Sequence, residues 1–507
     1  MKFPWILSLG VGFLSLSQEI LWMRFISFAN RGVPQSFSFV LMIFLAGIAA
    51  GALMGRLLCT RADKLYTPSG LLLLGTCALD MVGPLIAAVP GFGFLSPFLI
   101  FLCAGLKGVL FPVAHQLGSV TVQGQVGKSV SRVYFFNIIG STLGPLVTGF
   151  WLLDHLSLQT SMLLVGFLAG VLGLLCLVRE APLKTTMKAA SALALLGFLF
   201  MLPNQMTVHL ACRMYEHTDP NAPVVQVIEN KSGIIHTVEA NDKGGTITFG
   251  GNVYDGRDNV DPRVNSNILQ RIFILNALRP EAARVLVIGV SSGAYLRLLA
   301  GFPKVKSIDA IEINPGYLEL IKGYPDIAPV LNDPKVHLHI DDGRRWLKRN
   351  PDEKFDIVVM NTTYHWRSYS SNLLSREFLQ LLQKHMNKGA VITYNATGSI
   401  DVLKTAGEVF AYSFRYVNFV LASDWDLRKL TAADGRRNML GIKKDGKPLF
   451  NASNLKDREF ITKTLKTPLA TLEQDEEAKG RAGEVITDWN MLPEFKYGNG
   501  FPASCPK

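Results

Sequence analysis

The chain has 507 residues and a net charge of +11 at pH 7. This length allows two to four domains with substantial hydrophobic cores. The positive charge is spread through loops without long basic runs, so a nucleic-acid partner is not expected. None of the six cysteines lies in a CxxC or CxxH spacing, so no metal site is expected either.

Apolar residues are concentrated before about Pro203. Most of the apolar runs approach the ~20 residues that a helix needs to cross a hydrocarbon core. The runs are 4–26, 37–58, 69–89, 91–117, 132–153, 157–178 and 188–204. We predict seven spans, with six as the alternative because the last run is short and alanine-rich. The first run has no small-residue cleavage site, which favours a retained span over a signal peptide.

The orientation follows from the lysines and arginines of the short loops, which are enriched on the cytoplasmic side. One side carries nine of them: Lys2, Arg56, Arg61, Lys64, Lys128, Arg132, Arg179, Lys184 and Lys188. The other side carries Arg24 and Arg31. This bias places the amino terminus in the cytoplasm. With seven spans the C-terminal half is then extracytoplasmic, and with six it is cytoplasmic.

Ionisable residues within the apolar runs are costly, so a functional role is the default hypothesis for them. Glu19, Asp80 and Lys107 are the candidates. Asp80 and Lys107 lie on neighbouring antiparallel segments and can meet at similar depth. Two readings remain open, a structural ion pair and a polar cavity for the headgroup of a substrate.

Cys212 and Cys505 are at the two ends of the less apolar half. In an oxidising compartment they can form a disulfide that ties the tail to the start of this half. Two unrelated free thiols are the other reading.

The region 222–255 alternates apolar and polar residues between glycine turns, which predicts a small antiparallel sheet. A helix-like stretch, NSNILQRIFILNAL, follows. Five apolar strands then alternate with helical stretches: RVLVIG, SIDAIEIN, VHLHIDDG, FDIVVMN and GAVITYN. This alternation predicts a parallel, Rossmann-like sheet with helices on both faces. We divide the chain into a membrane domain (1–205), a small β-sheet subdomain (206–265), the Rossmann-like domain (266–445) and a C-terminal extension (446–507).

Ligands of such sheets bind at the carboxyl ends of the strands. A glycine turn follows the first strand, Glu312 ends the second, twenty-three positions after Gly289, and an acidic pair ends the third. A carboxylate at the second position can accept both hydroxyls of a ribose, and one at the third can accept from an adenine amino group. The predicted nucleoside site consists of Gly289, Ser292, Gly293, Glu312, Asp341, Asp342 and Gly343. Helix capping by the acids is the alternative.

With these residues, about 222–420 resembles the spermidine synthase family of aminopropyltransferases. The best matches are EIN at 312–314 and DDGRRWL at 341–347. EILWMRF at 19–25 and FNIIGSTLGPLVTGFWLL at 136–153 resemble the multi-span segment fused to some bacterial members. The resemblance implies a methyltransferase-type fold, S-adenosylmethionine or its decarboxylated form as ligand, and a bacterial inner-membrane location.

The chain departs from this family where its catalytic acids are expected. The family's first loop reads GGGDGG, and Ser292 stands at the position of its acid. The family's catalytic loop reads DSSDP, whereas Asn361 to His365 read NTTYH here. A polyamine site needs carboxylates to hold and deprotonate the acceptor amine. Transfer to putrescine is therefore not expected.

The polar and aromatic loop 361–375 replaces the acid loop, and such loops at strand ends often bind ligands. We predict catalytic roles for Asn361, Tyr364 and His365, with His365 as a base. Substrate contacts are predicted for Tyr254, Asp255, Asp258, Trp366 and Arg367. The other reading is a packed loop in which His365 is only hydrogen-bonded.

Two functions remain open. The first is an S-adenosylmethionine-type transferase with a non-polyamine acceptor that is either delivered by the membrane or anionic. The second is an inactive, extracytoplasmic module that binds a small molecule or a membrane or periplasmic protein. A transporter has less support, because the spans show no clear inverted repeat.

Overall fold

A computed structural model describes residues 2–62, 64–119, 126–212, 219, 221–242, 244–361, 364–444, 446–475 and 482–496. Their contacts divide the chain into two units. The first unit comprises Met1–Asn30, Gln35–Ala211 and Glu229–Lys231, and the second comprises Arg31–Pro34, Cys212–Ile228 and Ser232–Lys507. Cys505 lies outside the described residues.

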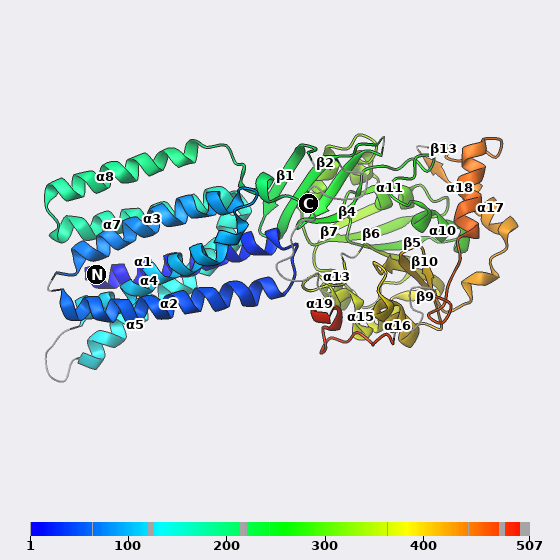
Figure 1. Cartoon of the computed structure of the whole chain (residues 1–507). Helices are drawn as coiled ribbons and strands as arrows, with labels where there is room; N and C mark the ends of the chain where they lie inside the picture. The colour runs from blue at the N-terminus through cyan, green and yellow to red at the C-terminus, as the bar shows by residue number, and fades with distance from the viewer. Residues whose placement is uncertain are drawn as a thin grey trace. The chain divides into compact units, whose positions relative to one another are not determined.

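The first unit is a bundle of long helices (Figure 1). They are α1 (Phe3–Ala29), α2 (Gln35–Arg61), α3 (Tyr66–Ala88), α4 (Ser96–Gly118), α5 (Val126–Val147), α7 (Leu158–Glu180) and α8 (Leu183–Gly197). Shorter elements join or follow them: η1 (Gly93–Leu95), η2 (Thr148–Leu152), α6 (Leu153–His155), η3 (Phe198–Met201) and α9 (Met206–Leu210). Seven helical stretches of the described chain are long and apolar enough to cross a membrane, including the weak last one at Leu183–Met201.

Glycines allow the helices of this bundle to approach closely. Gly47, Gly51 and Gly55 recur every fourth residue along α2 and face the backbone of α4. A Cβ built on Gly47 would lie 2.5 Å from the carbonyl oxygen of Phe101, and one on Gly51 would overlap that of Gly105. Such stripes of small residues drive helix packing where both surroundings and side chains are apolar.

The charged side chains inside the bundle are paired. Lys107 Nζ lies 2.6 Å from Asp80 Oδ2, and both side chains are buried. An isolated buried charge would be far more costly than this pair. This geometry is that of the structural ion pair, one of the two interpretations that the sequence leaves open for Asp80 and Lys107. Glu19 is half-buried on α1.

The second unit begins with the small antiparallel sheet that the sequence predicted. Its strands are β1 (Val224–Asn230), β2 (Gly233–Glu239), β3 (Thr246–Gly250) and β4 (Val253–Arg257), paired in that order. The register of β3 and β4 shifts between Thr248 and Phe249, which leaves Asp255 of β4 without a partner on β3, as at a β-bulge. Helix α10 (Gln270–Leu278) follows at the predicted helical stretch.

A seven-stranded sheet forms the centre of the second unit. Its strands are β5 (Arg284–Ile288), β6 (Ser307–Glu312), β7 (Val336–Ile340), β8 (Phe355–Met360), β9 (Met386–Asn395), β10 (Tyr412–Tyr416) and β11 (Phe419–Ser423). The order is β10-β11-β9-β8-β5-β6-β7. The five predicted strands are parallel, whereas β11 pairs antiparallel with β9 and β10. This is a Rossmann-like sheet of the methyltransferase type, and its antiparallel edge was not foreseen.

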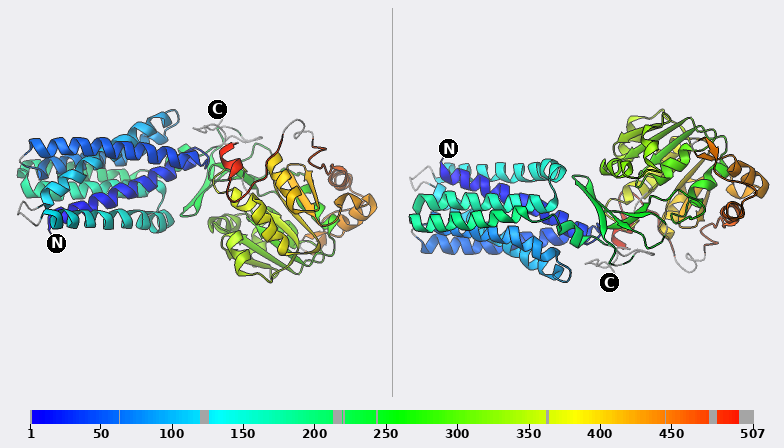
Figure 2. Two further views of the ribbon diagram at one scale, coloured as in Figure 1. Left: turned by 90° about the horizontal axis from the view of Figure 1, so that it is seen from below. Right: turned by 90° about the horizontal axis from the view of Figure 1, so that it is seen from above.

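Both faces of this sheet are buried. Val285 and Val287 of β5 pack into one hydrophobic cluster with α10, α11 (Ala294–Ala300) and α12 (Gly316–Lys322). Leu286 and Ile288 alternate with them and pack on the other face. There they meet α13 (Gly343–Arg349), α15 (Arg376–Lys384) and α16 (Ile400–Val409). Figure 2 shows these helices on the two faces. Continuous apolar strands are explained by this double coverage.

The remaining helices and strands are short or lie after the sheet. They are η4 (Ala328–Asn332), α14 (Ser371–Leu374), η5 (Leu427–Lys429), α17 (Ala432–Leu440), β12 (Lys443–Lys444), β13 (Lys447–Pro448), α18 (Leu455–Lys466) and α19 (Leu492–Lys496).

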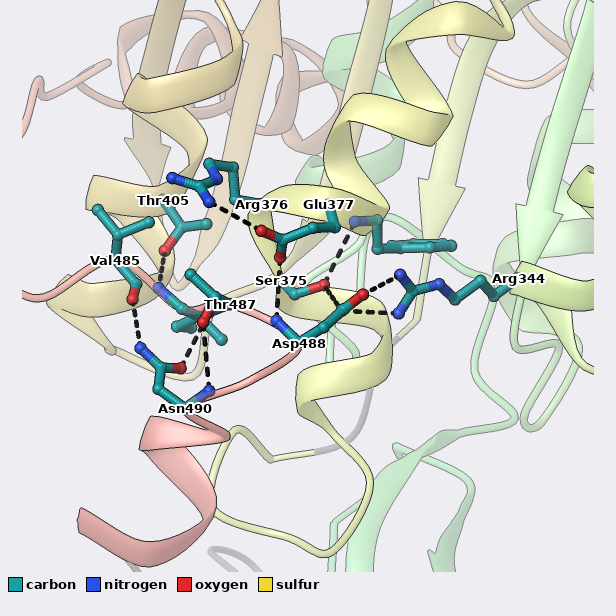
Figure 3. A network of polar contacts seen from close by, with 11 residues as sticks. Arg344, Ser375, Arg376, Glu377, Thr405, Val485, Thr487, Asp488 and Asn490 are labelled. Atoms are coloured by element: carbon teal, nitrogen blue, oxygen red, sulfur yellow. Dashed lines mark hydrogen bonds and ion pairs between the residues drawn. The ribbon is translucent and has the colours of Figure 1, made fainter.

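The segment 482–496 is held on the domain by a polar network centred on Asp488 (Figure 3). Arg344 of α13 donates to both carboxylate oxygens of Asp488. Ser375 donates to the same carboxylate at 2.6 Å, and the backbone N–H of Asp488 donates to Glu377. A bidentate guanidinium pair is directional as well as strong. The network fixes where this segment lies against α13 and α15.

Replacement of Gly51 by alanine tests the close packing of α2 on α4. The added Cβ would overlap the Gly105 carbonyl, so we expect a lower melting temperature of the detergent-solubilised chain. Gly75→Ala on α3 is the matched control, because a Cβ there meets nothing within 4 Å. It should leave the melting temperature unchanged or raise it, since alanine favours helix by about 1 kcal/mol. Equal melting temperatures for both variants would contradict the packing.

Candidate nucleoside-binding site

A cavity of about 270 Å³ lies at the carboxyl ends of β5, β6 and β7, where parallel sheets bind their ligands. The small sheet and the loop after β8 complete its walls. Its polar and glycine lining consists of Ser232, Gly233, Gly250, Gly251, Asp255, Gly289, Ser291, Glu312, Asn314, Tyr317, Asp341, Asp342, Gly343, Asn361 and Arg367.

The glycine turn after β5 needs the conformational freedom of glycine. Gly289 and Gly293 have φ values of 82° and 79°, in the left-handed region that other residues avoid. A Cβ on Gly289 would lie 2.8 Å from the carbonyl oxygen of Asn361. The turn therefore brings bare backbone to the cavity wall between β5 and β8. Gly293 itself begins α11 and is not among the lining residues.

Glu312 is the central acid of the cavity. Its Oε2 accepts from the N–H of Val290 at 2.7 Å, and its Oε1 accepts from the N–H of Asn314 at 2.9 Å. Burial raises the pKa of Glu312 to about 7, although these backbone N–H groups oppose the rise. Oε2 also accepts a longer bond from the N–H of Ser291 at 3.4 Å, whereas Oε1 keeps a second acceptor site. Glu312 can therefore still accept a hydroxyl group from a ligand.

The acidic pair after β7 is divided between two tasks. Asp342 caps α13 by accepting from the N–H of Arg345 at 2.8 Å. Asp341 forms ion pairs with Arg345 and Arg349, and the Arg345 guanidinium helps to lower the pKa of Asp341 although desolvation opposes this. Both acids also line the cavity. Asp342 therefore caps the helix, as the alternative interpretation expected, and also lines the cavity.

A second charged group faces the cavity from the small sheet and the loop after β8. The hydroxyl of Tyr317 donates to Asp255 Oδ2, and Arg367 is close enough to both to perturb their titration. Burial raises the pKa of Asp255 to about 6, opposed by Tyr317 and Arg367. Asp255 is therefore mostly ionised at neutral pH, beside a cation.

Two adjacent glycines make room for this group. A Cβ on Gly250 would overlap the Tyr317 hydroxyl, and one on Gly251 would overlap the Arg367 guanidinium. On a further side of Arg367, a Cβ on Gly32 would lie 3.1 Å from Arg367 Nε. Sequence patterns single out neither Tyr317 nor these glycines, although Gly250 and Gly251 lie in the region 222–255 that is predicted as strands between glycine turns.

His365 does not line the cavity. Its Nδ1 lies 2.6 Å from Thr397 Oγ1, and Ser370 donates to its backbone carbonyl. Burial lowers the pKa of His365 to about 4. A neutral, hydrogen-bonded imidazole corresponds to the packed-loop reading of this residue.

Two aromatic residues of the loop, Trp366 and Tyr364, pack against each other, whereas Tyr369 is 74% exposed. Trp366 is 6% exposed and clusters with Val33, Val253 and Tyr364. The rings of Tyr364 and Trp366 lie 5.5 Å apart. Of the three residues predicted as catalytic, only Asn361 lines the cavity.

Three further predicted residues lie beside the cavity without lining it. The Ser292 hydroxyl donates to the Arg257 carbonyl at 2.7 Å, and its neighbour Ser291 lines the wall instead. Asp258 accepts from the N–H of Thr246 and borders a separate cavity of about 420 Å³. Tyr254 contacts Asn267 at 3.5 Å.

Two other expectations concern cysteine and metal. Cys212 is disulfide-bonded, whereas Cys59, Cys77, Cys103 and Cys176 are free thiols. Within the described ranges, His, Cys, Asp and Glu form no group of three that could hold a metal ion.

Residues 274–419 match the family model of the spermine/spermidine synthase domain. Relatives include the polyamine aminopropyltransferase of Agathobacter rectalis, 28% identical over 23% of this chain and 41% of that protein. The spermidine synthase of Solanum lycopersicum is 32% identical over 23% of this chain and 34% of its own. That of Coffea arabica is 31% identical over 27% and 46%. The chain thus spans less than half the length of these curated relatives.

Two solved structures are similar as well. A spermidine synthase in complex with the transition-state analogue AdoDATO is 15% identical, covers 50% of this chain and 88% of its own, and has a TM-score of 0.41. The Thermotoga maritima spermidine synthase has a TM-score of 0.39, with 50% and 87% covered. From the family match and the curated relatives, the C-terminal half of this chain contains a spermidine synthase domain, preceded by a helical N-terminal region.

Proposed function

We propose that this is a membrane-bound protein whose C-terminal domain binds S-adenosylmethionine or a related nucleoside and transfers a group to a non-polyamine acceptor. The observation that carries the proposal is Glu312 on the cavity wall, between the glycine turn of β5 and the acids after β7. Adjacent strands of a sheet are ~4.8 Å apart. These groups are therefore spaced along the sheet edge like the parts of one extended nucleoside.

The acceptor side of the cavity argues against a polyamine. Ser292 and Tyr364 occupy the positions where the family resemblance leads us to expect acids. Asp255 remains, but it is beside Arg367 and accepts from Tyr317. A polycation brought to this place would meet a guanidinium, and the two like charges repel.

A binding module without catalysis is the second candidate function. It is favoured by His365, the predicted base, which is buried, hydrogen-bonded to Thr397 and absent from the cavity wall. The partner of such a module would be a small molecule or a membrane or periplasmic protein.

We also propose an extracytoplasmic location for the C-terminal domain, with the helical region in the bacterial inner membrane. The charge bias of the loops and seven helices of spanning length support this topology. The disulfide at Cys212 suits an oxidising compartment. With seven spans, Arg31–Pro34 and Ser232–Lys507 are on the same side, and their contacts assign both to the second unit.

Nucleoside binding should depend on pH through Glu312. Its ionised form accepts ribose hydroxyls better than its protonated form, and its pKa is raised to about 7. Affinity for 5′-methylthioadenosine, measured by calorimetry on the detergent-purified chain, should therefore rise from pH 6 to pH 8. Glu312→Gln should lower the affinity about tenfold and remove the pH dependence.

Glu319→Gln is the matched control, because Glu319 is an exposed acid on α12. It should bind like the unchanged protein. Absence of nucleoside binding by the unchanged protein at every pH would refute the proposed nucleoside site.

Spermidine formation is the second measurement. With putrescine and decarboxylated S-adenosylmethionine as substrates, the purified chain should produce no spermidine above a protein-free control. The reason is that, by the family resemblance, Tyr364 replaces the acid that takes the proton from the amine and Ser292 replaces the acid that contacts the donor. Robust turnover would overturn the non-polyamine assignment while leaving the nucleoside site intact.

The compartment can be measured with reporter fusions after Lys507. If the chain has seven spans, alkaline phosphatase fused at this end should be active and green fluorescent protein fused there should not fluoresce. A fusion after Arg61, in a loop with cytoplasmic charge bias, should give the opposite pair of signals. Fluorescence at the Lys507 end would show that Leu183–Met201 does not cross.

A further inference from the structure

Arg367 is the only lysine or arginine among the described residues that line the cavity. The other charged lining residues are the acids Asp255, Glu312, Asp341 and Asp342. Asp341 is already paired with arginines outside the cavity, and Asp342 caps a helix. Asp255 lies on the same wall as Arg367, since a Cβ on Gly250 would lie 3.2 Å from Asp255 Oδ2 and one on the adjacent Gly251 would overlap the Arg367 guanidinium.

The position of Arg367 is fixed by the backbone around it. The N–H of Ser368 donates to the Gly32 carbonyl at 2.9 Å. Glu494 accepts from the N–H groups of Tyr369 and Ser371 at 2.9 and 3.0 Å. The loop that carries Arg367 is therefore held on both sides. A fixed guanidinium loses little entropy when it binds a carboxylate in a two-bond geometry.

Asp255 and Arg367 present a carboxylate and a guanidinium to the same end of the cavity. An anion beside a cation complements a zwitterion, since Asp255 can accept from an ammonium and Arg367 can donate to a carboxylate. Tyr317 restrains Asp255 through its hydroxyl, and Gly250 and Gly251 leave space for both side chains. An α-amino acid group has this pair of charges on a single carbon.

The strand order decides which part of a nucleoside reaches this end. Across β8-β5-β6-β7, the lining residues are Asn361, Gly289, Glu312 and Asp341 in that sequence. With the ribose at Glu312 and the base toward Asp341, the substituent on the 5′ carbon points toward β5 and β8. Arg367 belongs to the loop that follows β8.

We infer that this cavity selects a nucleoside whose 5′ substituent ends in an intact α-amino acid, namely S-adenosylmethionine, over its decarboxylated form. The inference rests on the proposed nucleoside site and names its substrate class. The carboxylate is held by Arg367 and the ammonium by Asp255. The decarboxylated ligand keeps the ammonium but lacks the carboxylate, so it offers Arg367 no anionic contact and its ammonium is not neutralised within the ligand.

Calorimetric titration of three nucleosides into the full-length chain tests this inference. The unchanged protein should bind S-adenosylmethionine at least about tenfold more tightly than its decarboxylated form, the factor typical of one charged hydrogen-bonded contact. Arg367→Gln should remove this preference. Arg367→Lys should restore part of it, because a lysine keeps the charge but not the two-pronged geometry.

5′-Methylthioadenosine separates the possible outcomes, because it lacks the amino acid group. Arg367→Gln should bind it as the unchanged protein does, which shows that the variant is folded, and so should the surface control Arg437→Gln. If the unchanged protein binds methylthioadenosine but binds the decarboxylated ligand as tightly as S-adenosylmethionine or more tightly, this inference is wrong and the nucleoside site stands. Failure to bind any of the three would refute the nucleoside site itself.

Discussion

The candidate site depends on the carboxylate of Glu312 and the backbone N–H groups that hold it. Val290 and Asn314 donate to its two oxygens, so the acid fastens the turn after β5 to the turn after β6. Replacing one partner would leave a buried polar group unsatisfied. Glu312 also lines the cavity, and its Oε1 accepts from a single N–H group. One side chain therefore both shapes the wall and presents the group that a ribose would contact.

A second constraint acts at the other end of the cavity. Arg367 is placed by Gly32, Gly251 and the segment around Glu494, which come from distant parts of the sequence. The C-terminal segment is in turn fixed by the Asp488 network (Figure 3). Loss of the acid loop thus does not leave an empty surface. It leaves a cavity with a different charge pattern, and that pattern is the basis of the proposed preference for a zwitterionic ligand over a polyamine.

The helical region follows a different physical rule. Its glycines bring helix backbones together, as along α2 and α4, and its internal charges Asp80 and Lys107 neutralise each other. Apolar surroundings reward close van der Waals contact rather than further hydrophobic burial. The disulfide at Cys212 adds a covalent restraint near the start of the second unit.

The sequence by itself determined the five parallel strands, the small sheet and the acids at the strand ends, because continuous apolar runs, alternation and glycine turns are local patterns. It did not foresee β10 and β11, and it left open whether His365 and Trp366 contact a ligand or pack in the loop; in the structure His365 is hydrogen-bonded to Thr397 and Trp366 is packed. Only the tertiary structure decided that Arg367, Tyr317 and Asp255 share one wall. They come from a loop, a helix and a strand, and no pattern within one segment records which side chains meet across three elements.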